Sequence, residues 1–293
     1  MHESDVDLIV GSIGRLDRLE RLAKSLCAPT GVNVRLIVVE QVDPVGAREV
    51  LVNHAGHLVW DVLECERGLS RARNVGLAAA TAPIVGFPDD DCWYEADTLK
   101  AVVEAFRQTG SDFVIGRQVT SAGYDVLRTP KSESFVDQHN VWRIAMSSAI
   151  FAQRPAVYTA GCFDENLGVG ASTPFQSGEE TDLVLNMIAT KHVGSYVPTI
   201  VIRHPRPDEV ANRLSRATGR GYGRGMGRVL AKHGFRRLDV FRHVARPLLG
   251  SLVALFRADA RLAQFRLSVA QGRLEGYLST RQEVRILAHE QLE

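Results

Sequence analysis

Residues 68–91 read GLSRARNVGLAAATAPIVGFPDDD, and this stretch decides the fold class. Residues 70–80 carry apolar side chains at helical spacing, which predicts a helix. Residues 84–87 form a short apolar run, typical of a buried strand, that leads into the aspartate triplet 89–91. A helix, a buried strand and an acidic turn in this order are typical of α/β folds, in which ligands bind beyond the carboxyl ends of the strands.

The same alternation of strands and helices extends in both directions from this stretch. Strands that alternate with helices pair in parallel, so we predict an α/β fold with a mostly parallel sheet flanked by helices. Residues 120–142 are polar and irregular, which predicts a surface loop. The further strands are predicted at residues 6–11, 34–39, 112–115 and 194–203, and the further helices at residues 15–26, 96–109 and 180–189.

Composition places the chain among ordinary globular proteins. Of its 293 residues, 45% are hydrophobic and 24% are charged, which excludes disorder over most of the chain and a collagen-like or coiled-coil rod. The four cysteines have no CxxC spacing and indicate reduced thiols. The N-terminus lacks the pattern of a signal peptide, and the apolar stretch at residues 244–256 contains Arg246 and Pro247 and is too short to span a bilayer. We therefore expect a cytoplasmic protein.

Charge is distributed unevenly along the chain. Residues 203–293 contain 18 Lys and Arg against 8 Asp and Glu, a net charge of +10, whereas residues 1–202 carry a net charge of −9. This difference favours separate organisational units and an anionic partner for the basic part. The pattern beyond Pro207 is helical, and glycines at every second position from Gly219 to Gly227 are expected to interrupt it.

Two features of the basic part indicate partners. Six arginines between residues 206 and 228 alternate with glycines and could form a solvated face, close over a bound diphosphate, or contact anionic lipid headgroups. An apolar stripe at residues 248–277 lies beside further arginines, which suits peripheral contact with the inner face of a membrane, packing on the chain's own domain, or a homodimer. A nucleic-acid partner is not expected, because no recognised binding module accompanies the charge.

The aspartate triplet is the strongest chemical signal in the sequence. Three adjacent carboxylates repel one another unless cations or hydrogen-bond donors offset their charge. In an extended segment Asp89 and Asp91 point to the same side, while Asp90 points to the other. A divalent cation, which prefers oxygen ligands, is the natural counter-charge, and a solvated acidic turn is the alternative.

A basic cluster precedes the triplet. Arg67, Arg71 and Arg73 surround a predicted helix start, where free backbone N–H groups favour anions and guanidinium groups recognise phosphate. A solvated basic helix start is the alternative interpretation.

Weaker signals follow the triplet. Glu179, Glu180 and Asp182 stand at another helix start, where they suit either simple helix electrostatics or a general base. His204 follows a predicted strand and is either a structural histidine or a ligand that completes a carboxylate-bound metal. Trp93 comes directly after the aspartates and lines either a cleft or the core.

Together these residues resemble the family 2 glycosyltransferases with the GT-A fold. The resemblance implies a nucleotide-sugar-binding half at residues 1–95 and a half for the acceptor and catalysis at residues 96–205, followed by a helical extension at residues 206–293. It covers residues 6–205 and rests on five segments in order: VDLIVGSIGRLDRLERLAKSL (6–26), GLSRARNVGLAAATAPIVGFPDDD (68–91), GCFDENLGVG (161–170), SGEETDL (177–183) and YVPTIVIRH (196–204).

The resemblance also implies a role for each matching residue. Asp89 and Asp91 would hold a divalent cation, Mn or Mg, against the diphosphate, with Asp91 as the direct ligand, and His204 would complete the coordination. Glu180 would be the catalytic base, with Glu179 and Asp182 as alternatives, and Trp93 would line the acceptor cleft. The residues that would bind the nucleotide-sugar are Ser12, Glu40, Arg67, Arg73, Asp89 and Asp90. Family members usually have Asp where Glu40 and Glu180 stand, and an aliphatic residue where Pro88 stands.

The function implied is that of an inverting glycosyltransferase. It would move a sugar from a nucleotide-diphosphate donor to a hydroxyl group of a glycan or a lipid-linked acceptor, in the synthesis of cell-surface glycans or polysaccharides. A sugar-nucleotide pyrophosphorylase is one alternative, although it needs a Gly-rich basic loop after the first strand that SIGRLDR scarcely supplies. A non-catalytic nucleotide-binding or carbohydrate-binding protein is the other.

Overall fold

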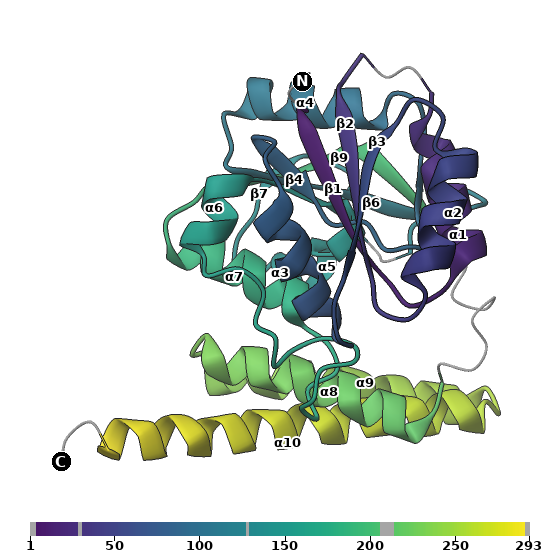
Figure 1. Cartoon of the computed structure of the whole chain (residues 1–293). Helices are drawn as coiled ribbons and strands as arrows, with labels where there is room; N and C mark the ends of the chain where they lie inside the picture. The colour runs from purple at the N-terminus through teal and green to yellow at the C-terminus, as the bar shows by residue number, and fades with distance from the viewer. Residues whose placement is uncertain (1–3, 29–30, 127–128, 206–213, 291–293) are drawn as a thin grey trace. The chain divides into compact units, whose positions relative to one another are not determined.

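The computed structural model describes the chain except residues 1–3, 29–30, 127–128, 206–213 and 291–293, and the side chains of residues 284–290 (Figure 1). The chain forms two compact units. The first comprises Met1–Phe163 and Leu183–Glu209, and the second comprises Asp164–Asp182 and Val210–Glu293.

The first unit is built on a nine-stranded mixed sheet with the path β3-β2-β1-β4-β8-β6-β9-β5, to which β7 adds by pairing with β9. The four strands β3, β2, β1 and β4 are parallel, and β6 is parallel to β9, whereas β8, β5 and β7 pair in antiparallel fashion. The mostly parallel α/β sheet predicted from the sequence is therefore confirmed. Its strands are β1 (Val6–Ser12), β2 (Val34–Glu40), β3 (Val59–Glu64), β4 (Ile84–Gly86), β5 (Trp93–Tyr94), β6 (Phe113–Thr120), β7 (Ser134–Phe135), β8 (Ile150–Gln153) and β9 (Gly194–His204).

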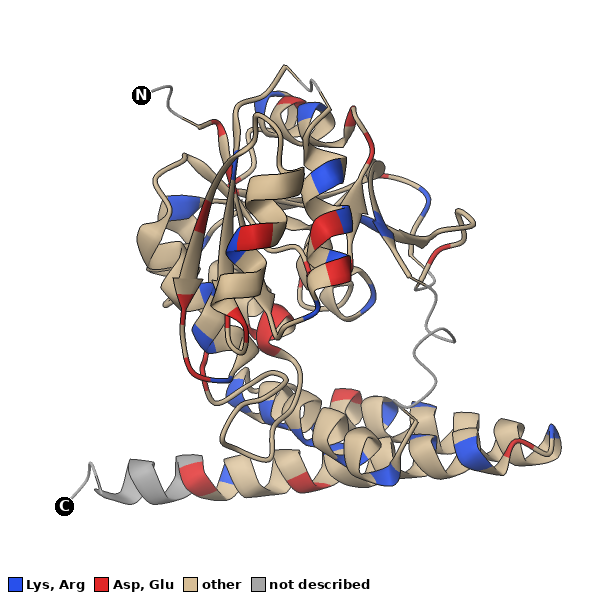
Figure 2. Ribbon diagram, turned by 45° about the vertical axis from the view of Figure 1, so that its right-hand side comes forward, with Lys and Arg blue, Asp and Glu red and all other residues tan. Residues whose placement is uncertain are grey.

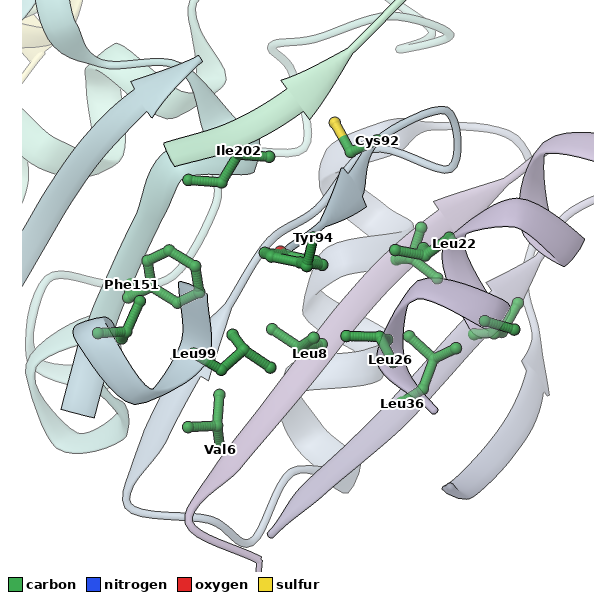
Figure 3. Close-up of a cluster of buried hydrophobic side chains, with 14 of the residues drawn as sticks. Val6, Leu8, Leu22, Leu26, Leu36, Cys92, Tyr94, Leu99, Phe151 and Ile202 are labelled. Atoms are coloured by element: carbon green, nitrogen blue, oxygen red, sulfur yellow. The ribbon is translucent and has the colours of Figure 1, made fainter. Parts of the chain in front are cut away.

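Helices connect these strands, and alternate residues of the central strands face different helices. Leu8 of β1 joins a core cluster with Leu22 of α1 and Leu99 of α4 (Figure 3). Ile9 points to the other face, where Gly76 of α3 lies so close that a Cβ there would come within 2.3 Å of its side chain. The helices up to β9 are α1 (Leu16–Leu26), α2 (Pro44–His54), α3 (Leu69–Ala79), α4 (Thr98–Thr109), α5 (Val141–Ile144), α6 (Arg154–Thr159) and α7 (Glu179–Ala189), with a 3₁₀ turn at Ser147–Ala149.

The prediction of an irregular loop at residues 120–142 is wrong in part. This segment contains β7 and the first residues of α5. The strands β3, β5 and β8 and the helix α2 were not predicted either. β3 is an edge strand with several exposed side chains, so it lacks the continuous apolar run of its buried neighbours.

The second unit contains three long helices, α8 (Arg216–Lys232), α9 (Arg237–Phe256) and α10 (Ala260–Glu290). The glycines of α8 do not interrupt the helix, contrary to expectation. Gly223 and Gly227 face α10, where an added Cβ would lie 2.3 Å and 2.2 Å from the backbone oxygens of Val269 and Arg273. The glycines therefore permit backbone-to-backbone contact between two parallel helices, and this packing offsets their low helix propensity.

Several arginines of α8 have acidic partners inside the same unit. Arg220 and Arg224 both pair with Glu275 of α10, and Arg228 pairs with Glu283 at 2.8 Å. Two of the six arginines predicted to meet an anion, at positions 206 and 213, lie outside the described residues. Within the described part of the chain, no helix is long and apolar enough to cross a membrane.

Candidate active site

The carboxyl ends of three parallel strands meet at one edge of the sheet in the first unit. Ser12 at the end of β1 is the register partner of Glu40 at the end of β2, and Gly11 forms an isolated parallel bridge with Asp89 just beyond β4. Ser12, Glu40 and Asp89 were all predicted to bind the donor. The topology brings all three to the same edge because parallel neighbours end at the same level.

Asp89 is held by a buried arginine. Nη2 of Arg73 lies 3.2 Å from Oδ1 of Asp89, and the hydroxyl of Ser147 donates to the same oxygen at 3.3 Å. Arg73 is 0% exposed, and its guanidinium group lies over the Phe163 ring, 5.2 Å from the centroid. A buried guanidinium group needs a carboxylate nearby, so Arg73 and Asp89 fix each other's position.

Asp90 faces a different arginine. Its carboxylate is fully buried and accepts a 2.8 Å hydrogen bond from Nε of Arg15, whose Nη2 also contacts the other carboxylate oxygen. Burial raises the pKa of Asp90 to about 7, against the opposing charge of Arg15. Asp90 therefore binds the residue that precedes α1, and it does not belong to the metal-ligating group found among the described residues.

Asp91 pairs with His204 at the end of β9. Nε2 of His204 lies 3.1 Å from Oδ1 of Asp91, and Nη1 of Arg18 lies 2.8 Å from Oδ2. Burial alone would raise the pKa of Asp91, but the hydrogen bond with His204 and the charges of His204, Arg15 and Arg18 lower it to about 2. The Asp91 carboxylate is thus ionised at neutral pH. Burial likewise opposes protonation of His204, and Asp91 nevertheless raises the pKa of this imidazole.

Four side chains at this edge lie close enough to bind one metal ion. The ligand atoms of Asp89, Asp91, Cys92 and His204 all lie within 4.8 Å of one another. Nδ1 of His204 lies 2.8 Å from the carbonyl oxygen of Pro205, and a proton on Nδ1 leaves the lone pair of Nε2 for a cation. Asp91 and His204, predicted as metal ligands, are therefore adjacent.

The chemistry of these four side chains favours a hard or borderline cation. Cys92 is fully buried, and burial raises the pKa of its thiol well above its usual value. The sulfur, which lies at the margin of the core cluster in Figure 3, is a neutral thiol at physiological pH and a poor ligand. Two carboxylates and one imidazole remain, and this donor set suits Mn²⁺ or Mg²⁺.

Glu40 turns back into the chain that follows its strand. Its Oε1 accepts backbone N–H groups from Gly14 at 2.7 Å, Val42 at 2.9 Å and Gln41 at 3.0 Å. Its Oε2 is buried and accepts no hydrogen bond from the described residues. The extra methylene of Glu, compared with Asp, lets one oxygen organise the turn while the other keeps its capacity as an acceptor.

The other predicted donor and cleft residues differ in their surroundings. Ser12 is buried, and its hydroxyl has no hydrogen-bond partner among the described residues. Arg67 is exposed on the loop before α3. Trp93 is half-buried beneath the guanidinium group of Arg21, which lies 4.3 Å from the ring centroid.

Three arginines at the N-cap of α1 and within this helix were not predicted as site residues. They recur at every third position, as Arg15, Arg18 and Arg21. Arg15 contacts the carboxylate of Asp90, and Arg18 contacts that of Asp91. Arg21 donates to the backbone carbonyl oxygen of Asp91 at 2.7 Å. This spacing places the three side chains on neighbouring parts of one helix face directly after the first strand, which is the signal that could have revealed them.

The second unit contains the three predicted candidates for the base, at the first turn of α7. Asp182 is fully buried and contacts Nε2 of His233 and Nζ of Lys232, both at 2.8 Å. Glu179 is also buried, whereas Glu180 is partly accessible to solvent. The Asp182 carboxylate thus belongs to an ion-pair network with Lys232 and His233. This contact distinguishes Asp182 from Glu180 as a candidate for the base, which the sequence alone could not do.

The sequence is similar to a known family of enzymes and to a curated relative. The sequence profile of glycosyl transferase family 2 matches residues 7–161, which is more than half of the chain. A pre-mycofactocin glycosyltransferase from Mycobacterium tuberculosis (strain CDC 1551 / Oshkosh) is 24% identical over 287 residues. That match covers 92% of this chain, and the chain spans 57% of the relative's length.

Solved structures share the fold at low sequence identity. The mannosyltransferase PcManGT from Pyrobaculum calidifontis, in complex with GDP-Man and Mn²⁺, has a TM-score of 0.66 at 16% identity, and the match covers 94% of this chain and 88% of that one. Residues 1–349 of S. aureus TarS, in complex with UDP-GlcNAc, have a TM-score of 0.58 at 15% identity, with 96% and 91% covered. The GT-A fold expected from the sequence is therefore confirmed.

Proposed function

The chain belongs to glycosyl transferase family 2, and on that premise we propose that it is a metal-dependent, inverting glycosyltransferase that uses a nucleotide-diphosphate sugar. The observation that carries the proposal is the close group of Asp89, Asp91 and His204 at the carboxyl edge of the sheet. Similar structures contain UDP-GlcNAc or GDP-Man, which supports a donor of this chemical class.

Asp89, Asp91 and His204 would hold the divalent cation. When bound, the cation offsets the negative charge of the departing diphosphate. Arg73 keeps the Asp89 carboxylate in place, and Arg18 does the same for Asp91, so the charges at the edge of the sheet are already oriented before the donor binds.

Ser12 and Glu40 would contact the nucleoside part of the donor. The hydroxyl of Ser12 and Oε2 of Glu40 have no partner among the described residues, although both are buried. A buried polar atom without a partner is costly, so a ligand that supplies the missing hydrogen bonds gains affinity. Oε2 of Glu40 is suited to an N–H group of a nucleobase, because an ionised carboxylate only accepts hydrogen bonds.

Glu180 is our candidate for the base. The acceptor hydroxyl would attack the anomeric carbon, its proton would pass to the Glu180 carboxylate, and the bond between that carbon and the diphosphate oxygen would break. A single displacement of this kind inverts the anomeric configuration. Glu180 is preferred to Asp182, because Lys232 and His233 already bind the Asp182 carboxylate. The acceptor class is a glycan or a lipid-linked sugar.

A donor panel tests the proposal directly. The full chain is incubated with UDP-sugars and GDP-sugars, with Mn²⁺, with Mg²⁺ or with excess chelator, and release of nucleoside diphosphate is measured. We expect release from one donor, with a requirement for the cation and with inverted configuration in the NMR spectrum of the product. Nucleotide binding without turnover on any donor or acceptor would instead indicate a non-catalytic binding protein, and full turnover in chelator would contradict the metal site.

A further inference from the structure

Helix α9 presents a broad apolar face to solvent. Its large apolar side chains recur at three- and four-residue intervals along one side of the helix, which makes a continuous stripe. Phe256 is 92% exposed, and Phe241 and Leu249 are each about two-thirds exposed, at 66% and 63%. We call this surface the α9 face, and it comprises Leu238, Phe241, Leu248, Leu249, Leu252, Val253, Leu255 and Phe256.

The opposite side of α9 is committed to α10. The hydroxyl of Ser251 donates to the carbonyl oxygen of Ala263 at 2.8 Å. Pro247 has no N–H to donate to the carbonyl oxygen of His243, and Arg273 of α10 supplies this hydrogen bond instead. These bonds fix the rotation of α9 about its axis, so the α9 face cannot turn inward without breaking them.

Arginines surround the α9 face. Residues 236–261 contain six arginines and two aspartates, and all six arginines are exposed. Basic residues are visible along the three C-terminal helices in Figure 2. The four arginines that form no ion pair with any described residue are Arg236, Arg237, Arg246 and Arg257.

The two aspartates do not offset this charge for an incoming partner. Asp239 pairs with Arg242 at 3.3 Å, and the carboxylate of Asp259 accepts the backbone N–H of Leu262 at the start of α10. The border of the α9 face is therefore cationic, and its centre is apolar.

We propose that the α9 face docks on the surface of a lipid bilayer that contains anionic lipids. The apolar side chains enter the boundary between headgroups and acyl chains, and the arginines bind headgroup phosphates. The helix lies in the plane of the surface, since no described helix can span a bilayer. A second copy of the chain fits less well, because a symmetric contact would bring the arginines of both copies together.

Sedimentation with vesicles tests the proposal on the full chain. The vesicles contain phosphatidylcholine with or without phosphatidylglycerol. We expect binding only with phosphatidylglycerol, and weaker binding at high salt, because the Debye length falls from about 10 Å at 0.1 M to about 3 Å at 1 M salt. Equal binding to both kinds of vesicle, or binding to neither, overturns the proposal.

Matched variants locate the surface. The double variant Leu252→Asp/Phe256→Asp should lower vesicle binding at least about tenfold, because it places two carboxylates at the membrane boundary. Arg246→Gln/Arg257→Gln should also weaken binding and should reduce its salt dependence. The control is Phe135→Asp, which changes a side chain of the first unit that is 73% exposed. It should bind vesicles like the unmodified protein.

The results for these variants distinguish a lipid bilayer from a second copy of the chain as the partner of the α9 face. All altered side chains are exposed, so each variant should unfold at the same temperature as the unmodified protein. Undiminished vesicle binding by Leu252→Asp/Phe256→Asp overturns the proposal. A dimer in analytical ultracentrifugation that this double variant dissociates, with no binding to vesicles, would assign the α9 face to a second copy of the chain.

Discussion

Nη1 of Arg18 lies 2.8 Å from Oδ2 of Asp91, while Nε2 of His204 lies 3.1 Å from Oδ1 of the same carboxylate. The two carboxylate oxygens therefore have separate partners: the arginines lie at Oδ2, and His204 lies at Oδ1. A cation that binds Oδ1 and His204 does not have to displace Arg18. The arginine from α1 thus orients a metal ligand rather than competing for it, which reconciles a salt-bridged aspartate with a site for a divalent cation.

Removal of the Asp91 charge tests the metal site. Asp91→Asn should weaken Mn²⁺ binding at least about 100-fold, because a neutral amide oxygen replaces an anionic ligand beside His204. Free Mn²⁺ measured by electron paramagnetic resonance gives the affinity without a need for catalytic turnover. Asp17→Asn, on the exposed first turn of α1, is the control and should bind like the unmodified protein. Unchanged Mn²⁺ affinity in Asp91→Asn would rule out this site.

Replacement of Glu180 tests the base. Glu180→Gln should lower kcat about 10²–10⁴-fold and leave the Kd of the donor unchanged, because the amide keeps the shape of the side chain but cannot accept the acceptor's proton. Single-turnover kinetics and donor titration measure the two quantities separately. A product that retains its anomeric configuration would contradict the single displacement, whatever the kinetics of the variant.

Asp182→Asn is the matched control for the base, and its effect should fall on stability. Asp182 is buried between Lys232 and His233, and removal of one partner from a buried ion pair costs about 3–5 kcal/mol. The variant should therefore unfold at a lower urea concentration than the unmodified protein, whereas Glu180→Gln should not. Loss of turnover at unchanged stability in Asp182→Asn would transfer the role of base to Asp182.

The sequence predicted which residues lie at the carboxyl edge of the sheet, but it did not predict how their side chains are oriented. Ser12, Glu40 and Asp89 follow buried apolar runs, and parallel pairing alone brings the ends of such strands together. The hydrogen bonds of Glu40 were not predictable, because they depend on the path of the turn after β2. Arg15 escaped notice for a similar reason, since its contact with Asp90 joins residues 75 positions apart.

The second unit shows a different limit of prediction. Glycine has low helix propensity, so five glycines in nine residues predict an interruption from local preference alone. The helix is continuous because α10 packs directly against the glycine backbone, and this long-range contact is invisible in a local pattern. The apolar stripe of α9 was predicted from its spacing, but the sequence did not show whether the stripe is exposed or packed. The exposed side and the packed side of α9 became distinct only with the contacts to α10.

A half-buried histidine in the second unit, His243, should make stability depend on pH. Burial, and then the charge of Arg273, lowers the pKa of His243 to about 4, below its ordinary value of 6.5. Arg246 also lowers this pKa, and Asp239 raises it. Between pH 6.5 and 4 the unfolded chain binds a proton that the folded chain excludes. The free energy of unfolding should therefore fall as the pH falls from 6.5 to 4. Above pH 6.5 His243 is neutral in both the folded and the unfolded chain, so there it causes no loss of stability.

The difference between two proteins isolates this contribution. His243→Asn cannot titrate, so its free energy of unfolding should depend less on pH between 6.5 and 4 than that of the unmodified protein. Between pH 6.5 and pH 4 the unmodified protein should lose about 1–2 kcal/mol more free energy of unfolding than His243→Asn. This figure allows for the solvent screening of a partly exposed group. Urea unfolding at several pH values measures it, and parallel curves for the two proteins would refute the assignment.

Two glycines of α8 provide the sharpest test of the helix packing in the second unit. A Cβ at Gly223 would lie 2.3 Å from the backbone oxygen of Val269, whereas a Cβ at Gly221 would meet only the flexible side chain of Gln176, at 3.1 Å.

Replacement of Gly by Ala favours the helix by about 1 kcal/mol at either site. At Gly223 the two helix backbones must separate, and overpacking of this kind typically costs about 1–3 kcal/mol, occasionally more. Gly223→Ala should therefore lower the free energy of unfolding measured in urea, and Gly221→Ala should leave that free energy within about 1 kcal/mol of the unmodified protein's or raise it. Equal free energies of unfolding for the two variants would mean that α8 and α10 do not pack through their backbones, because local propensity alone treats both glycines alike.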